Sequence, residues 1–172
     1  MSPNDRANPL RVVCAVILNR GRMLAARRLP GGIHPPLFEF PGGKIIGGET
    51  PFEAIRREIR EELSLEIRPL AQGSAVFHHY PKRCIELIPV LCDRPRGILR
   101  LTDHSEIRWI RPDRWEELEW LEADRVLIQK NDLIRFTSAK ANRVPYKKKS
   151  PTLASPARSQ KQRSQKNPER QK

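Results

Sequence analysis

The sequence is poor in several features that mark particular protein classes. Its 172 residues contain only three cysteines, an odd number without a CxxC pair, which argues against a disulfide framework. The longest apolar run, Val12–Leu18, is far too short to span a bilayer. The first ten residues contain no apolar secretory segment. We therefore expect a cytoplasmic protein that makes no membrane contact and keeps Cys14, Cys84 and Cys92 as buried free thiols.

Acidic residues are scarce mainly at the C-terminal end. The net charge is +13, and residues 138–172 hold eleven Lys or Arg against one acid. Residues 1–137 hold twenty-two against nineteen, so the basic character belongs mostly to the last segment. That segment has four prolines and little aliphatic content, and it cannot bury enough apolar surface to fold alone. We predict a flexible segment at 1–10, one domain at 11–137 and a disordered basic tail at 138–172.

The tail has two interpretations. It either keeps the protein solvated or makes weak, salt-dependent contact with nucleic acid or ribosomes by neutralising phosphates. Tyr146 is its single aromatic residue, so the pattern does not favour specific recognition of bases. For the folded part we expect a monomer.

Three carboxylates recur on one predicted helix, which spans Pro51–Leu63. Thr50 is a natural N-cap, and Glu53 completes a capping box with it. Glu58, Glu61 and Glu62 stand at i, i+3 and i+4 and therefore share one helix face, where like charges repel. A solvated charged face is one interpretation. The other is a site for a hard divalent cation, which commonly handles phosphates.

The remaining pattern alternates strands with helices. We predict strands at 11–18, 22–28, 38–40, 99–101 and 106–110, an antiparallel pair at 66–80 and 82–93, and a closing helix at 124–136. A loop rich in Gly and Pro covers 29–36. The pairs Gly42-Gly43 and Gly47-Gly48 mark turns where backbone can approach a ligand.

The segment 43–65 resembles the Nudix box, G-x5-E-x7-R-E-U-x-E-E-x-G-U, where U is aliphatic. The matching positions are Gly43, Glu49, Arg57, Glu58, Ile59, Glu61, Glu62 and Leu65. Ser64 replaces the family glycine that ends the helix, which costs about 1 kcal/mol if the left-handed conformation is kept. Residues 38–44 and 120–124 are similar to the MutT-type branch. The resemblance implies a Nudix α/β/α sandwich with a mixed sheet between helices.

By matching position, the resemblance also implies a metal site. Glu58, Glu61 and Glu62 would bind Mg2+, with Mn2+ as a substitute and with the backbone carbonyl of Gly42 as a further ligand. Asp103 stands where this branch usually has an additional acidic ligand, and Glu106 and His104 are alternatives. A water-mediated contact and a simple turn at Asp103 both remain open.

The resemblance implies roles in catalysis and substrate binding as well. Glu58 would deprotonate or orient the attacking water, and Arg57 would position Glu58. Attack on an internal phosphorus would release a nucleoside monophosphate and pyrophosphate. Asp124 would read the base edge as an ionised acceptor, unless it serves only as a helix N-cap. The other expected substrate contacts are Arg28, Phe40 and Lys44.

Three functions follow from the resemblance. The first is a nucleoside triphosphate pyrophosphohydrolase that removes oxidised nucleotides such as 8-oxo-dGTP and so supports DNA replication and repair. The second is a Nudix hydrolase acting on CTP, a nucleotide sugar or capped RNA. The third is a non-enzymatic Nudix-fold binding module. The intact run Arg57–Glu62 argues against the third, because a pure binder has no need of three repelling acids.

Overall fold

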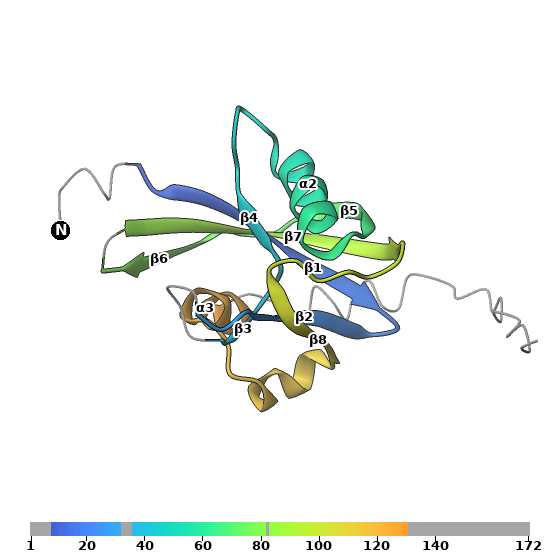
Figure 1. Ribbon diagram of the computed structural model, residues 1–172. Helices are drawn as coiled ribbons and strands as arrows, with labels where there is room; N and C mark the ends of the chain where they lie inside the picture. Colours follow the sequence, from blue (N-terminus) through green and yellow to red (C-terminus); the bar gives the residue numbers. More distant parts are fainter. Residues whose placement is uncertain (1–7, 32–35, 82, 131–172) are drawn as a thin grey trace, which may run out of the picture.

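One mixed eight-stranded sheet carries the fold in the part that the structure, a computed structural model, describes: residues 8–31, 36–81 and 83–130. Figure 1 shows its elements in chain order. They are β1 (Leu10–Asn19), β2 (Arg22–Arg28), β3 (Phe38–Glu39), β4 (Gly42–Lys44), α2 (Pro51–Leu63), β5 (Glu66–Gln72), β6 (Val76–Tyr80), β7 (Arg83–Arg96), β8 (His104–Ile110), the 3-10 helix η1 (Pro112–Glu117) and α3 (Glu122–Lys130).

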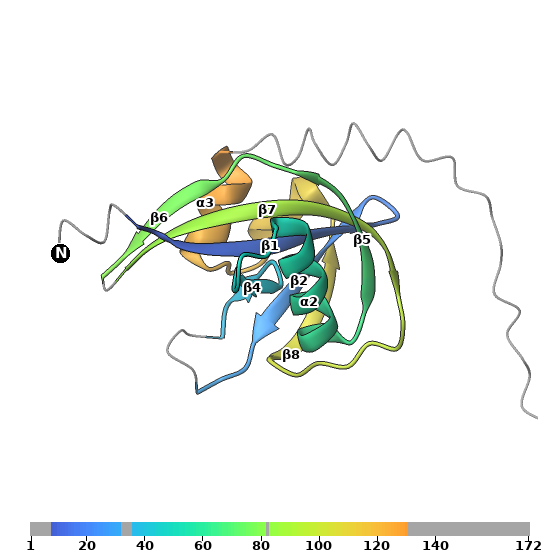
Figure 2. The same cartoon turned by 90° about the horizontal axis from the view of Figure 1, so that it is seen from above.

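The sheet is organised around a parallel pair. β1 and β7 run in parallel from Leu10↔Ile85 to Leu18↔Asp93, and the two strands lie side by side in Figures 1 and 2. The main path is β3-β2-β1-β7-β5, and the other pairings between the named strands are antiparallel. Off this path, β4 adds to β1, β6 to β7 and β8 to β2. The expected mixed sheet is therefore confirmed.

The two faces of the sheet bury two separate cores. Side chains alternate along a strand, so Val13, Ala15 and Ile17 face α2, whereas Cys14 and Val16 face α3. The helices lie on opposite sides of the sheet in Figure 1. This arrangement confirms the α/β/α sandwich.

Helix α2 has the predicted bounds because its signals are local. The Thr50 side chain accepts a hydrogen bond from the Glu53 N–H, and the Glu53 side chain accepts one from the Thr50 N–H. Ser64 ends the helix in the left-handed conformation, with φ 54° and ψ 32°. The serine therefore keeps the backbone conformation that glycine favours, and with it the associated strain.

Several expected elements differ from the structure. The predicted strand 66–80 is divided into β5 and β6, and Gly73 between them donates its N–H to the Pro89 carbonyl. The predicted strand at 99–101 is wrong: these residues form a loop, which contacts the end of α2. β8 begins earlier than expected, at His104.

The ends of the chain leave three expectations untested. The closing helix is described as far as Lys130, so its predicted part beyond that residue lies outside the described residues. The same holds for residues 1–7 and for the basic tail. None of the helices within the described ranges is long and apolar enough to cross a membrane.

Candidate active site

Arg57 joins the glycine-rich loop to helix α2. Its Nε and Nη2 donate to the two carboxylate oxygens of Glu49 at 2.7 and 2.9 Å, and Nη2 also donates to the Lys44 carbonyl at 2.9 Å. The hydrogen bonds from Arg57 lower the pKa of Glu49 to about 2. A bidentate pair of this kind fixes direction as well as distance. The loop between Lys44 and Glu49 is thereby tied to α2.

The same guanidinium holds two of the three expected metal ligands. Nη1 of Arg57 donates to Glu58 at 2.8 Å and to Glu61 at 3.2 Å. Glu58 also lies against the backbone of Gly43, where a Cβ atom would come within 2.5 Å of its carboxylate. Gly43 therefore leaves the room that the Glu58 side chain occupies. The predicted positioning of Glu58 by Arg57 is present as a direct hydrogen bond.

Glu62 is the buried member of the trio. Its carboxylate accepts the N–H of Gly42 at 3.0 Å and is only 9% exposed. Burial, followed by the charges of Glu39 and Glu58, raises the pKa of Glu62 to about 8. Gly42 itself has φ 152°, and a Cβ atom there would lie 2.2 Å from the Val13 carbonyl oxygen. A side chain at position 42 is thus excluded by neighbouring backbone.

The donor set fits a hard divalent cation. Glu58, Glu61 and Glu62 offer only oxygen ligands, and a cation would relieve the repulsion that raises the pKa of Glu62. Over the described ranges, no three such side chains already converge on one point, since Arg57 holds two carboxylates and Gly42 the third. Metal binding would therefore require these side chains to rotate.

The loop before β8 caps the C-terminal end of α2. The Thr102 N–H and hydroxyl donate to the carbonyls of Glu62 and Glu61, both at 3.0 Å. The Arg100 N–H donates to Leu63 at 3.0 Å. These bonds satisfy carbonyls that a helix end leaves without partners. They place Asp103 near Glu62, where its charge contributes to the raised pKa of Glu62.

Glu39 is a site residue that the sequence reasoning missed. Arg28 Nη1 donates to its two carboxylate oxygens at 2.9 and 3.0 Å, and the Nε2 atom of His104 lies 2.9 Å from Oε1. Its charge raises the pKa values of Glu62 and Asp124, so it lies near both groups. The sequence contained an indication of this. Side chains alternate along a strand, so Glu39, which stands between the buried Phe38 and Phe40, must point to the opposite face of the sheet from these two rings.

The expected contacts with the base are arranged differently from the sequence prediction. Asp124 is buried, and one of its oxygens accepts the Phe40 N–H at 2.9 Å. Burial and then the charge of Glu39 raise the pKa of Asp124 well above its usual value, so its neutral form is easier to reach than in water. The N-cap alternative is wrong, because α3 already begins at Glu122. Phe40 packs 5.0 Å from Trp120 in the core.

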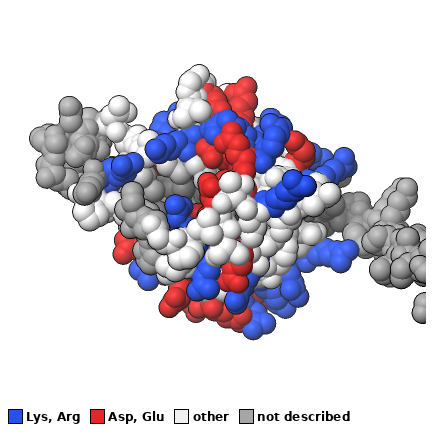
Figure 3. Space-filling view, viewed as in Figure 1, with Lys and Arg blue, Asp and Glu red and all other residues white. Residues whose placement is uncertain are grey.

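The other expected substrate residues lie nearer the surface. Arg28 is held by Glu39, with 40% of its side chain exposed. Lys44 has an exposed side chain, and its carbonyl accepts from Arg57. Acidic and basic side chains are interleaved over the α2 side of the molecule (Figure 3). The site is therefore a mixed-charge region.

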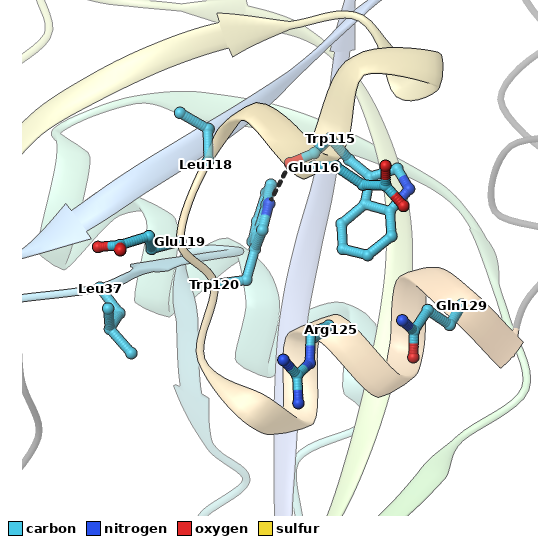
Figure 4. Close-up of a pocket in the computed structure, with 8 residues that line it drawn as sticks. All are labelled: Leu37, Trp115, Glu116, Leu118, Glu119, Trp120, Arg125 and Gln129. Carbon is cyan, nitrogen blue, oxygen red and sulfur yellow. Dashed lines mark hydrogen bonds between the residues drawn. The ribbon is translucent and has the colours of Figure 1, made fainter.

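A separate hollow lies between η1 and α3, on the other face of the sheet from α2. It has a volume of about 490 Å3, and its lining includes Trp115, Trp120, Arg125 and Gln129 (Figure 4). The Trp120 indole donates to the Trp115 carbonyl at 2.8 Å. None of the expected metal ligands or substrate contacts lines this hollow.

Comparison with known proteins agrees with this geometry. The NUDIX domain model matches residues 8–135. The chain is 31% identical over 139 residues to the putative 8-oxo-dGTP diphosphatase 2 of Mycobacterium tuberculosis, covering 76% of this chain and 92% of that protein. It is 30% identical over 123 residues to the CTP pyrophosphohydrolase of Escherichia coli, covering 70% and 89%.

Solved structures share the fold. The solution structure of the E. coli ORF135 protein aligns with a TM-score of 0.66 at 27% identity, covering 79% of this chain and 94% of the other. The MutT NUDIX hydrolase from Burkholderia pseudomallei aligns with a TM-score of 0.62 at 22% identity, covering 72% and 98%. With the family model, the box geometry and these relatives taken together, the chain belongs to the MutT-type branch of the Nudix family and is a phosphoanhydride hydrolase.

Proposed function

We propose that the protein is a Mg2+-dependent nucleoside triphosphate pyrophosphohydrolase that releases a nucleoside monophosphate and pyrophosphate, with 8-oxo-dGTP as its preferred substrate. The observation that supports this chemistry best is the pair of hydrogen bonds from the Arg57 guanidinium, to Glu58 at 2.8 Å and to Glu61 at 3.2 Å, beside the buried Glu62. A charged face without a function would not need one arginine to bind two of its acids and the preceding loop.

The proposed mechanism assigns roles to these side chains. Glu58, Glu61 and Glu62 would hold Mg2+ or Mn2+, which when bound neutralises polyphosphate charge and acidifies a bound water. Glu58 would also orient the attacking water and accept its proton, and the hydrogen bond from Arg57 would help to direct its carboxylate. Asp103 supports the site through a direct or water-mediated contact. Lys44, with its exposed ammonium, neutralises phosphate oxygens.

Glu39 and Asp124 support recognition of the base. Arg28 and His104 orient Glu39, which accepts hydrogen bonds. Asp124, whose raised pKa eases protonation, would donate one in its neutral form. A guanine edge offers both N–H donors and a carbonyl acceptor. The similarity to a putative 8-oxo-dGTP diphosphatase over 76% of the chain supports this substrate. Phe40 supports this recognition indirectly, because its backbone N–H donates a hydrogen bond to Asp124.

CTP is the second candidate. The Glu39 carboxylate also suits the amino group of cytosine, and the similarity to the E. coli CTP pyrophosphohydrolase has nearly the same identity. In either case we propose action in the cytoplasm, since Cys14, Cys84 and Cys92 are buried free thiols, which suits a reducing compartment.

A substrate panel tests the proposal. Pyrophosphate release with Mg2+ would be measured for 8-oxo-dGTP, dGTP, CTP, ADP-ribose and a dinucleoside polyphosphate, and the values of kcat/KM compared. We expect the highest value for 8-oxo-dGTP and no turnover in EDTA. If CTP were preferred, the proposed hydrolytic mechanism would stand, but CTP would replace 8-oxo-dGTP as the proposed substrate. Equal turnover with and without divalent metal would contradict the proposed site.

A further inference from the structure

A polar connection runs from the C-terminal end of α2 to the short strand β3, and its last members, His104 and Glu39, are buried. Thr102 binds the last carbonyls of α2, and His104, two residues further on, reaches Glu39 on β3 with its Nε2 atom at 2.9 Å. Between them, the Asp103 carbonyl accepts the Leu29 N–H at 3.3 Å. The segment 102–104 is therefore held at α2, at the end of β2 and at β3.

The hydrogen bonding of His104 indicates which of its two ring nitrogens carries the proton. Its side chain is 1% exposed, and its Nδ1 atom is the buried side-chain N or O atom without a partner in the part of the chain that the structure describes. Placing the ring proton on Nε2 lets the Glu39 carboxylate accept it and leaves only a lone pair at Nδ1. The opposite tautomer would bury an unpaired N–H donor. His104 therefore donates to Glu39.

A packing role alone does not account for this histidine. A leucine would fill a similar volume in the same buried place without leaving a nitrogen unpaired, and an unpaired buried nitrogen is unfavourable. Among the residues that the structure describes, Nε2 has Glu39 as its hydrogen-bond partner, and the other side-chain donor to Glu39 is Arg28. The two donors approach Glu39 from β8 and β2, and together they leave its carboxylate little freedom to rotate.

We propose that His104 is a positioning residue that holds Glu39 at a set place relative to the metal carboxylates, and thereby controls how well the enzyme binds its nucleotide. The inference rests on the proposed function, since it takes Glu39 as a contact of the base. Segment 102–104 is hydrogen-bonded to the carbonyls of Glu61 and Glu62, so the position of the base contact is fixed relative to the metal site. Errors in such placement weaken binding of the nucleotide without removing any reacting group.

Two substitutions at position 104 test whether His104 acts as a hydrogen-bond donor or only fills space in the core. His104→Leu removes the donor, whereas His104→Gln places an amide N–H near the position of Nε2. With the nucleotide that the wild-type enzyme prefers, we expect His104→Leu to raise KM about tenfold, with kcat within about twofold. His104→Gln should stay within about threefold of wild type in KM. Thermal melting of both variants checks that the fold is retained. Equal KM values for the two variants would overturn the proposal.

A double substitution tests whether His104 acts through Glu39. We expect Glu39→Gln to raise KM, and His104→Leu to add little when combined with it, because the two residues form one unit. If His104→Leu raises KM by the same factor with or without Glu39→Gln, the two residues act independently and the inference is wrong.

A measurement without turnover keeps this inference separate from the proposed function. In 15N NMR of the histidine rings, the Nε2 signal of His104 should be that of a protonated nitrogen and should shift in Glu39→Gln. An unchanged signal would overturn the inference even in an active enzyme. A shifted signal with no hydrolysis of any nucleotide would preserve the contact and reject the proposed function instead.

Discussion

Replacing Glu62 by glutamine should stabilise the metal-free protein while it removes metal binding. The pKa of Glu62 is about 8 in the folded state, against an ordinary value of 4.5. Between pH 4.5 and 7 the unfolded chain loses this proton and the folded chain keeps it, so stability falls as the pH rises. Over that range the wild-type protein loses about 3 kcal/mol of its free energy of unfolding through this group, at roughly 1.4 kcal/mol for each pH unit.

Urea unfolding in EDTA at pH 4.5 and pH 7 measures this effect. We expect the stability difference between Glu62→Gln and wild type to grow by about 3 kcal/mol in favour of the variant from the lower to the higher pH. Glu61→Gln is the matched control, because Glu61 lies on the same helix with 59% of its side chain exposed. Adding Mg2+ at pH 7 should stabilise wild type and not Glu62→Gln. A difference that does not change with pH would refute the reasoning.

Further substitutions test α2 and its surroundings. Glu58→Gln should lower kcat by about 10²–10⁴-fold with an unchanged circular dichroism spectrum, and near-normal turnover would reject Glu58 as the base. Gly43→Ala should lower kcat because its Cβ would lie 2.5 Å from the Glu58 carboxylate, whereas Gly42→Ala should lower the melting temperature because its Cβ would meet the Val13 carbonyl. Ser64→Gly should add about 1 kcal/mol to the free energy of unfolding in urea, and Ser64→Ala, which keeps the strained φ, should add none.

The catalytic helix could be predicted from the sequence because its determinants lie close together in the chain. The capping box at Thr50 and Glu53 and the spacing of Glu58, Glu61 and Glu62 act within a few residues of each other. Helical geometry alone then places the carboxylates on one side. The contact of Arg57 with Glu58 follows from the same short range.

The proposed base contacts could not be predicted in the same way, because their residues meet through pairing of distant strands. Glu39 meets His104 only because β2 lies between β3 and β8 in the sheet. The charge state of Asp124 depends on burial and on Glu39, neither of which follows from its position near a helix start. The predicted strand at 99–101 was wrong because its backbone caps α2 instead of joining the sheet.

The parallel pairing of β1 with β7 has a consequence for how the protein acquires activity as it folds. Leu10 pairs with Ile85, 75 residues further along, so this contact forms only after a long loop of chain has closed. The inner side of α2, with Ile55 and Ile59, is buried against side chains of β1 and β7 and cannot be covered before that closure. Refolding should therefore restore nucleotide hydrolysis together with burial of the core, in a phase later than the first appearance of helix.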